Sequence, residues 1–345
     1  MKKVLTIFIL TIVSVVLFLS LGGCGLPSVE SQIKKVDGYY VYEESGGAEH
    51  IKQCSLMGAD KDKIINGCLT IPDKIGGVLV KSVGAKRKMW VGEDWTTPMY
   101  ENDEIKKIVI NHRLTIYQSA FSNLKELVEI EINENVVIEH NAFYGNSLSS
   151  ISLTNFDFFH NLNYFLDTST LRSIRVKSND CYNKLGMSHP ENVVALYISN
   201  YTKLPETSFE KYNSLSSLII PETISYIDKN AFKNSDVDVF VRLDEETFKQ
   251  KLNNGWDDGI NVEWGFSDEI VVFDSIGGTE IKTDSTQKNY LIVKMGEKII
   301  PPSQPTRDGY AFLGWFKDYT LLELWNFETD IVEDSMVLIA GWQKI

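Results

Sequence analysis

Aliphatic side chains recur through the middle of the chain with a period of 22 residues, give or take one. Each copy has an aliphatic residue, two variable residues, a second aliphatic residue, one variable residue and a third. The six copies start at residues 105, 127, 148, 171, 193 and 215. The last two aliphatic side chains of a copy lie on one side of an extended chain, so each copy predicts a short β-strand. A single coil cannot bury that side alone, so the repeat predicts a solenoid with a parallel strand ladder and one continuous core.

A second marker, a small residue followed by phenylalanine, keeps the same period. It occurs at Ala120-Phe121, Ala142-Phe143, Ser208-Phe209 and Ala231-Phe232. We expect these rings to stack from coil to coil along the wall opposite the ladder, with the small neighbour leaving room for them.

These coils resemble the BspA type of leucine-rich repeat. The best copy runs from Ile220-Pro221 to Ala231-Phe232, and it departs from the family pattern at Asp228 and Asn234, where the family often has Gly and Cys. The resemblance covers roughly residues 69–240. It implies a solenoid of a kind found mostly in secreted or surface-attached microbial proteins.

Both ends of the solenoid are predicted to be capped. A strand-rich pattern over residues 37–90 indicates an N-terminal β cap, and the solenoid with its C-terminal cap is expected over 91–266. The acidic start of the segment from Asp244 to Leu252 predicts a short helix covering the last coil.

The period disappears after the solenoid, and residues 270–345 predict a further module. Gly309 to Trp315 spell Gly-Tyr-x-Phe-x-Gly-Trp, the core motif of the internalin-type B repeat, or Listeria–Bacteroides repeat, which this segment resembles. Ile276 replaces the usual Asn, and Gly341 replaces a charged residue. The resemblance implies a small β-grasp-like fold that serves as a spacer or weak interaction unit, so the fold class expected for the chain is mainly β.

The N-terminus predicts export. A basic start at Lys2-Lys3 precedes an apolar run from Val4 to Leu21, as in a secretory signal. Leu21-Gly22-Gly23-Cys24 resembles the lipobox of bacterial lipoproteins. The resemblance implies cleavage after residues 1–23, a lipid on Cys24, a tether over 24–36, and a protein held on the outer face of a bacterial membrane. The alternative is an uncleaved membrane helix, because eighteen apolar residues are just long enough to span a bilayer.

Charge and motifs narrow the function classes. The net charge of −13 argues against a nucleic-acid partner, which would need a basic face. The chain has no hydrolase, zinc-protease or nucleotide-binding motif, and its five histidines have no metal-like spacing, so we expect no cofactor, metal or small-molecule substrate. Cys54 and Cys68 leave two alternatives open, a disulfide permitted by export or two separately buried thiols.

The outer face of the strand ladder is the best candidate for binding. Residues between the inward aliphatic positions should face solvent, and the candidates are Glu129, Glu131, Asn133, Arg175, Lys177 and Tyr197. The alternative is an ordinary solvated sheet. The leading hypothesis is therefore a surface protein that binds a protein or glycan, followed by a structural envelope protein without a specific ligand and, last, a hydrolase.

Overall fold

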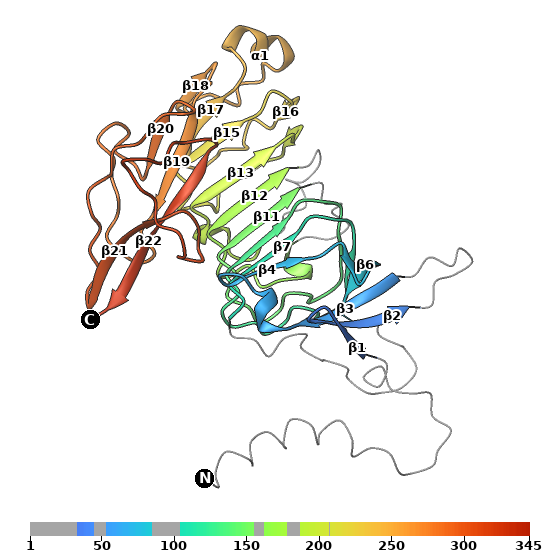
Figure 1. Ribbon diagram of the computed structural model, residues 1–345. Coiled ribbons are helices and arrows are strands. Elements are labelled where there is room, and N and C mark those ends of the chain that lie inside the picture. The colour runs from blue at the N-terminus through green and yellow to red at the C-terminus, as the bar shows by residue number, and fades with distance from the viewer. Residues whose placement is uncertain (1–32, 45–52, 85–103, 155–161, 178–186, 207) are drawn as a thin grey trace, which may run out of the picture. The chain divides into compact units, whose positions relative to one another are not determined.

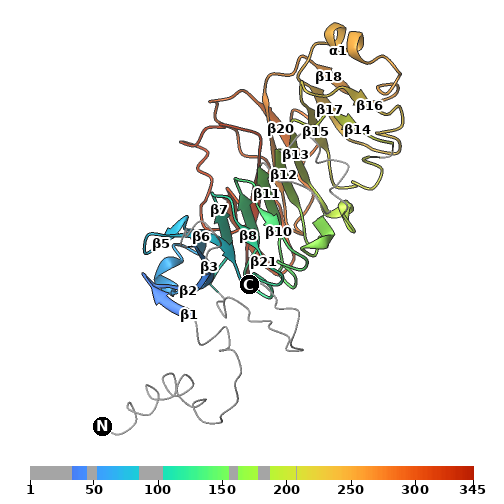
Figure 2. The ribbon, with the colours of Figure 1, turned by 90° about the vertical axis from the view of Figure 1, so that its right-hand side faces the viewer.

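The computed structural model describes residues 33–44, 53–84, 104–154, 162–177, 187–206 and 208–345, which form a mainly β structure (Figures 1 and 2). The predicted signal, Cys24 and the first part of the tether lie outside the described residues, as does Cys181. The chain divides into two units, residues 1–33 and 34–345. The second unit contains every described residue except Ile33.

The N-terminal sheet follows the order β1-β2-β3-β6-β8-β10, with β5 beside β6. Its strands are β1 (Ile33–Val36), β2 (Tyr39–Glu44), β3 (Gln53–Ala59), β5 (Lys74–Ile75), β6 (Val78–Val83), β8 (Thr115–Ile116) and β10 (Val137–Ile138). A short 3-10 turn, η3, covers Lys61–Lys63. The parallel pairs β6–β8 and β8–β10 continue this sheet into the first coils of the solenoid.

The predicted ladder is present as a parallel sheet in the order β4-β7-β9-β11-β12-β13. Its strands are β4 (Cys68–Ile71), β7 (Lys107–Ile110), β9 (Glu129–Ile132), β11 (Ser150–Thr154), β12 (Ser173–Lys177) and β13 (Ala195–Ser199). The register aligns equivalent repeat positions, for example Ile130 with Ile151 and Ile174 with Leu196. Equivalent positions of successive repeats therefore form columns along the ladder.

The later coils continue the same construction. Their elements are η4 (Leu162–Tyr164), η6 (Pro190–Asn192), β14 (Lys203–Leu204), β15 (Ser217–Ile220), β16 (Tyr226–Ile227), β17 (Asp238–Val241), α1 (Glu245–Lys251) and β18 (Val262–Trp264). The predicted capping helix is α1, and Asp244 caps it by accepting a hydrogen bond from the Thr247 amide. Phe248 and Trp256 are buried in the solenoid core, which closes its last coil.

Every inward aliphatic side chain predicted from the repeat is buried, and together they form one core with the capping residues. The phenylalanines stack as expected: Phe121 lies 5.3 Å from Phe143, and Phe209 lies 4.9 Å from Phe232, centroid to centroid. The prediction of a parallel solenoid with a shared dry interior is confirmed.

The C-terminal module is a mixed sheet in the order β20-β19-β22-β21. Its strands are β19 (Glu269–Asp274), β20 (Tyr290–Val293), β21 (Tyr310–Phe316) and β22 (Met336–Lys344). The central pair β19–β22 is parallel and both outer pairs are antiparallel, an arrangement that fits the β-grasp-like expectation.

The central strands of the module are buried on both faces. Val271 and Phe273 point into the module's own core with Trp315 and Leu338. Their neighbours Ile270 and Val272 belong to a different cluster, together with Val337 and Ile339 of β22 and with solenoid residues such as Val194, Ala195 and Phe240. The module is therefore docked on the outer face of the ladder through an apolar interface. Its expected role as a spacer or weak interaction unit stays a prediction.

Candidate functional site

The ladder and the docked module enclose a groove of about 400 Å³, called the ladder groove below. Residues from β9, β11, β12 and β13 form one wall. The module supplies the other wall with Lys317, Asp318, Tyr319, Met336 and Val337. Among the candidates from the sequence, those that line the groove are Glu129, Glu131, Asn133, Arg175 and Tyr197. Lys177 is exposed at the end of β12 and does not line it.

Acidic side chains at one end of the groove share a lysine. The Lys107 ammonium lies 2.7 Å from Glu129 Oε1 and 3.0 Å from Glu131 Oε2. Asn133 Nδ2 donates to Glu131 at 2.8 Å and to Asn111 on the neighbouring coil. The parallel register creates this cluster, because it places Lys107 opposite Glu129 and Val109 opposite Glu131.

The pKa values of the two carboxyl groups are shifted in opposite directions. Burial raises the pKa of Glu129 above its ordinary value, and the attraction of Lys107 does not offset it. For Glu131, burial also acts upward, but the hydrogen bonds from Asn133 and Lys107 outweigh it and lower the pKa. Burial works against the charge of Lys107, yet the two carboxylates hold the pKa of that ammonium above its usual range. The cluster thus carries one fixed cation between two unequal acids.

Arg175 and Tyr197 form a second feature of the groove. The Arg175 guanidinium lies 4.4 Å from the centroid of the Tyr197 ring, within the range of a cation–π contact. It also donates to Asp334 and to the Ser335 carbonyl of the module. The Tyr197 hydroxyl is buried and has no hydrogen-bond partner, although other parts of the residue are accessible. That hydroxyl is an unused polar group beside the groove.

A buried ion pair holds the module next to the groove. Arg172, just before β12, donates from Nε and Nη2 to the two carboxylate oxygens of Asp274 at 2.5 and 2.6 Å. The Tyr319 hydroxyl donates to the same carboxylate at 2.9 Å. On the far side of the interface, Arg242 donates to Glu269 of β19. The apolar contact is non-directional, so these paired charges set the orientation of the module on the ladder.

The ladder face is less solvated than the sequence predicts. Docking of the module leaves Glu129, Ser173, Ala195 and Ser217 buried, although their positions in the repeat face away from the solenoid core. The prediction of a freely exposed ladder face is wrong, because the module covers part of it. The two-sided apolar run Ile270 to Phe273 was the available signal, since a strand at a module surface should alternate instead.

The module residues of the groove were missed by reasoning from the sequence. Lys317, Asp318 and Tyr319 follow β21 in a connecting segment with no repeat pattern, and only the docked arrangement brings them opposite the ladder.

Cys54 and Cys68 lie on different sheets, in β3 and β4 respectively. Cys54 is buried and Cys68 is half-buried, and burial raises the pKa of the Cys68 thiol above its ordinary value. A disulfide between them stays a prediction, with two separate thiols as the alternative.

Among the described residues, no group of three or more His, Cys, Asp or Glu side chains is placed to hold a metal ion. No helix in that part of the chain has the length and apolar character needed to cross a membrane.

Family models match most of the chain outside the N-terminus. Residues 97–188 and 190–251 match the BspA type leucine-rich repeat region in six copies, and residues 270–341 match the Listeria–Bacteroides repeat domain. The molecule is thus a leucine-rich-repeat solenoid with a docked β module. More particularly, the chain carries BspA-type repeats followed by a Listeria–Bacteroides repeat, as both resemblances predict.

Two curated relatives come from Evansella cellulosilytica. One, provisionally named a membrane protein, is 30% identical over 145 residues, which cover 35% of this chain and 21% of the relative. The other, provisionally named a Gly-rich membrane protein, is 28% identical over 153 residues, covering 44% of this chain and 16% of the relative. The chain therefore spans about a fifth or less of the length of these relatives.

Among solved structures, the chain is similar to a leucine rich cell surface protein from Faecalibacterium prausnitzii A2-165. The identity is 14% and the TM-score is 0.20, over 71% of this chain and 97% of that chain.

Proposed function

We propose that this protein is an extracellular binding or adhesion protein, anchored to the bacterial membrane by a lipid on Cys24, and that the ladder groove contacts a protein or glycan outside the cell. The observation that carries the proposal is the convergence of Glu129, Glu131, Asn133, Arg175 and Tyr197 on one groove. The names of the curated relatives, both described as membrane proteins, support a place at the membrane.

The chemistry of the groove favours recognition over catalysis. Its acids are held by Lys107 and its guanidinium by Asp334, so charges of both signs are fixed in place before a ligand arrives. Preorganised charges favour selective binding because less side-chain entropy is lost on association.

The groove can be blocked without touching the core. Ser152 is half-buried on β11, between Glu131 and Arg175 in the register, and Ser152→Trp places an indole in the groove. Thr70→Trp is the matched control: Thr70 lies opposite Val109 in the same column of the ladder but outside the groove. Cells displaying each variant would be tested for attachment to immobilised extracellular-matrix proteins and cell-wall polymers. We expect loss of attachment with Ser152→Trp only. Equal attachment by both folded variants would contradict the proposal.

The anchor has its own test. The wild type should incorporate labelled palmitate, and Cys24→Ser should abolish that incorporation. A wild type that stays in the membrane fraction without label would support the uncleaved-helix alternative instead.

A structural envelope protein is the second candidate. The coverage of Ala195 and Ser217 by the module supports it, because this protein occupies part of its own ladder face. If no probe attaches to the wild type and deletion of the gene alters envelope integrity, this candidate replaces the first.

A further inference from the structure

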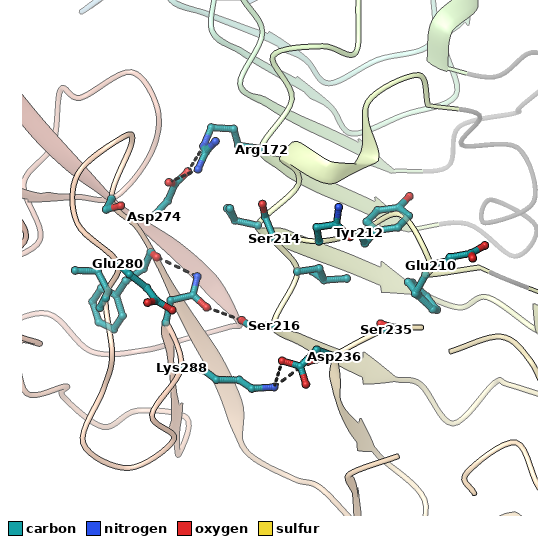
Figure 3. Close-up of a pocket in the computed structure, with 18 of the residues that line it drawn as sticks. Arg172, Glu210, Tyr212, Ser214, Ser216, Ser235, Asp236, Asp274, Glu280 and Lys288 are labelled. Carbon is teal, nitrogen blue, oxygen red and sulfur yellow. Dashed lines mark hydrogen bonds and ion pairs between the residues drawn. The ribbon is translucent and has the colours of Figure 1, made fainter. Parts of the chain in front are cut away.

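A second cavity, of about 500 Å³, lies between the later coils of the solenoid and the module, and we propose that it binds a short neutral oligosaccharide (Figure 3). The solenoid side comes from Arg172, Val194 and the coil segments 209–216 and 234–236. The module side comes from the end of β19 and the segment that leads to β20. The volume falls within the range of small-ligand pockets.

Uncharged hydrogen-bonding side chains outnumber charged ones in the lining of this cavity, eight to six. The hydroxyls and amides that line it belong to Tyr212, Asn213, Ser214, Ser216, Asn234, Ser235, Ser275 and Asn289. Ser216 donates to Asn289 across the cavity wall at 2.6 Å, which holds both groups in place. The Ser235 hydroxyl is buried without a hydrogen-bond partner. A ligand rich in hydroxyls satisfies such groups best, because each sugar hydroxyl can both donate and accept.

Four of the six charged side chains that line the cavity pair with one another, and a fifth, Glu280, pairs with Lys282 outside the lining. Figure 3 shows the Arg172–Asp274 pair on one side and Lys288 with Asp236 on the other. Asp274 accepts from Arg172, from Tyr319 and from the Ile276 amide, so no oxygen of this buried carboxylate is left for a ligand cation. Glu210 accepts from the Asn234 amide. These pairings favour a neutral ligand over an ionic one.

This site is distinct from the ladder groove. Asp274 lines the cavity, whereas Tyr319, which donates a hydrogen bond to Asp274, lines the ladder groove. The inference therefore does not rest on the proposed function, and Ser152→Trp should leave saccharide binding unchanged.

The chain offers a matched pair of variants for the test. Ser214 is exposed at the cavity and donates to the Glu191 carbonyl of the preceding coil at 2.7 Å. Ser225 is also exposed and donates to the Thr202 carbonyl at 3.0 Å, but it does not line the cavity. Ser214→Trp should obstruct the site, while Ser225→Trp makes the same chemical change elsewhere on the solenoid.

The probes are cellotriose and triacetylchitotriose as neutral ligands, with spermidine as a cationic one. Each is titrated by ligand-observed NMR against the full-length protein in a detergent that has no sugar headgroup. We expect at least one neutral probe to bind the wild type and Ser225→Trp saturably, and Ser214→Trp to bind it at least about tenfold more weakly. If Ser214→Trp does not fold, Ser235→Ala decides, with an expected loss of about fivefold and no fall in melting temperature.

Three results would overturn the inference. The first is no saturable binding of either neutral probe below about 10 mM. The second is undiminished binding by the deciding variant in its folded state. The third is binding of spermidine alone that Ser214→Trp abolishes, which would assign the cavity to a cationic ligand.

Discussion

Arg172 of the solenoid and Asp274 of the C-terminal module form a two-point hydrogen-bonded ion pair whose carboxylate is almost completely buried, with a relative exposure of 1%. The guanidinium is 30% exposed and comes from a connection between coils. The pair therefore fixes the module to the solenoid at the point where the two cavities approach each other.

Removal of the guanidinium should destabilise the protein strongly. Arg172→Met leaves the Asp274 carboxylate buried with only the Tyr319 hydroxyl and the Ile276 amide, and we expect the free energy of unfolding to fall by about 3 kcal/mol. Lys282→Met is the control, because the Lys282–Glu280 pair is exposed on both sides and should contribute less than about 1 kcal/mol. Chemical denaturation measures both, and equal small losses would show that the buried pair does not anchor the module.

Removal of two tyrosine hydroxyls near the interface should have different effects on the free energy of unfolding. Tyr197→Phe removes a buried hydroxyl that has no partner, so the free energy of unfolding should stay constant or rise by up to about 1 kcal/mol. Tyr319→Phe removes a donor to a carboxylate and should cost about 1.5–3 kcal/mol. Thermal and denaturant unfolding of the two variants compare them directly. A loss of stability in Tyr197→Phe would mean that its hydroxyl already has a partner in solution.

The two acids of the ladder groove predict opposite pH dependences. Glu131 has a lowered pKa in the folded state, so its charge contributes stability above the ordinary value of 4.5 that disappears as the pH falls through the folded-state pKa. The advantage of the wild type over Glu131→Gln should therefore shrink as the pH is lowered. Glu129 has a raised pKa, so the folded state favours its neutral form. The wild type should lose stability relative to Glu129→Gln as the pH rises above 4.5.

Unfolding free energies of the wild type and both variants between about pH 3 and pH 7 test these signs. Because the other titrating groups are common to all three proteins, the differences isolate the two carboxyl groups. Parallel curves for the two variants would contradict the assignment.

The shared interior of the coils is open to a simple test. Ile130 is fully buried, and Ile130→Ala should lower the free energy of unfolding by about 2–5 kcal/mol through lost contacts and the cavity left behind. Val137 is 54% exposed on β10, and Val137→Ala should change the free energy of unfolding by less than about 0.5 kcal/mol. A marginal effect at Ile130 would mean that its side chain is not inside.

The local elements could be predicted because each depends on nearby residues. The period of 22 placed aliphatic side chains at equivalent positions of successive strands, and the register aligns Ile130, Ile151 and Ile174 accordingly. Asp244 marked the start of α1, since a carboxylate there can accept from the amides of the first turn. The Gly309 to Trp315 motif placed β21.

Gly341 shows where local reasoning stops. The family pattern suggested a charged residue there, and the sequence offered no reason for glycine. In the structure, a Cβ at this position would collide with the Phe316 ring on the neighbouring strand. The close packing of β21 on β22 therefore requires glycine here.

The spacing of apolar residues is enough to show which side of each coil is apolar, and therefore to predict the solenoid, its core and the separate sheet of the module. Docking of the module on the ladder depends on contacts between distant residues, because the run from Ile270 to Phe273 indicates that both faces of β19 are covered without indicating what covers them. The pairing of Arg172 with Asp274 joins residues 102 positions apart, and no local pattern encodes such a choice. The ladder groove is a product of that docking, since five of its fourteen lining residues belong to the module and not to the repeat.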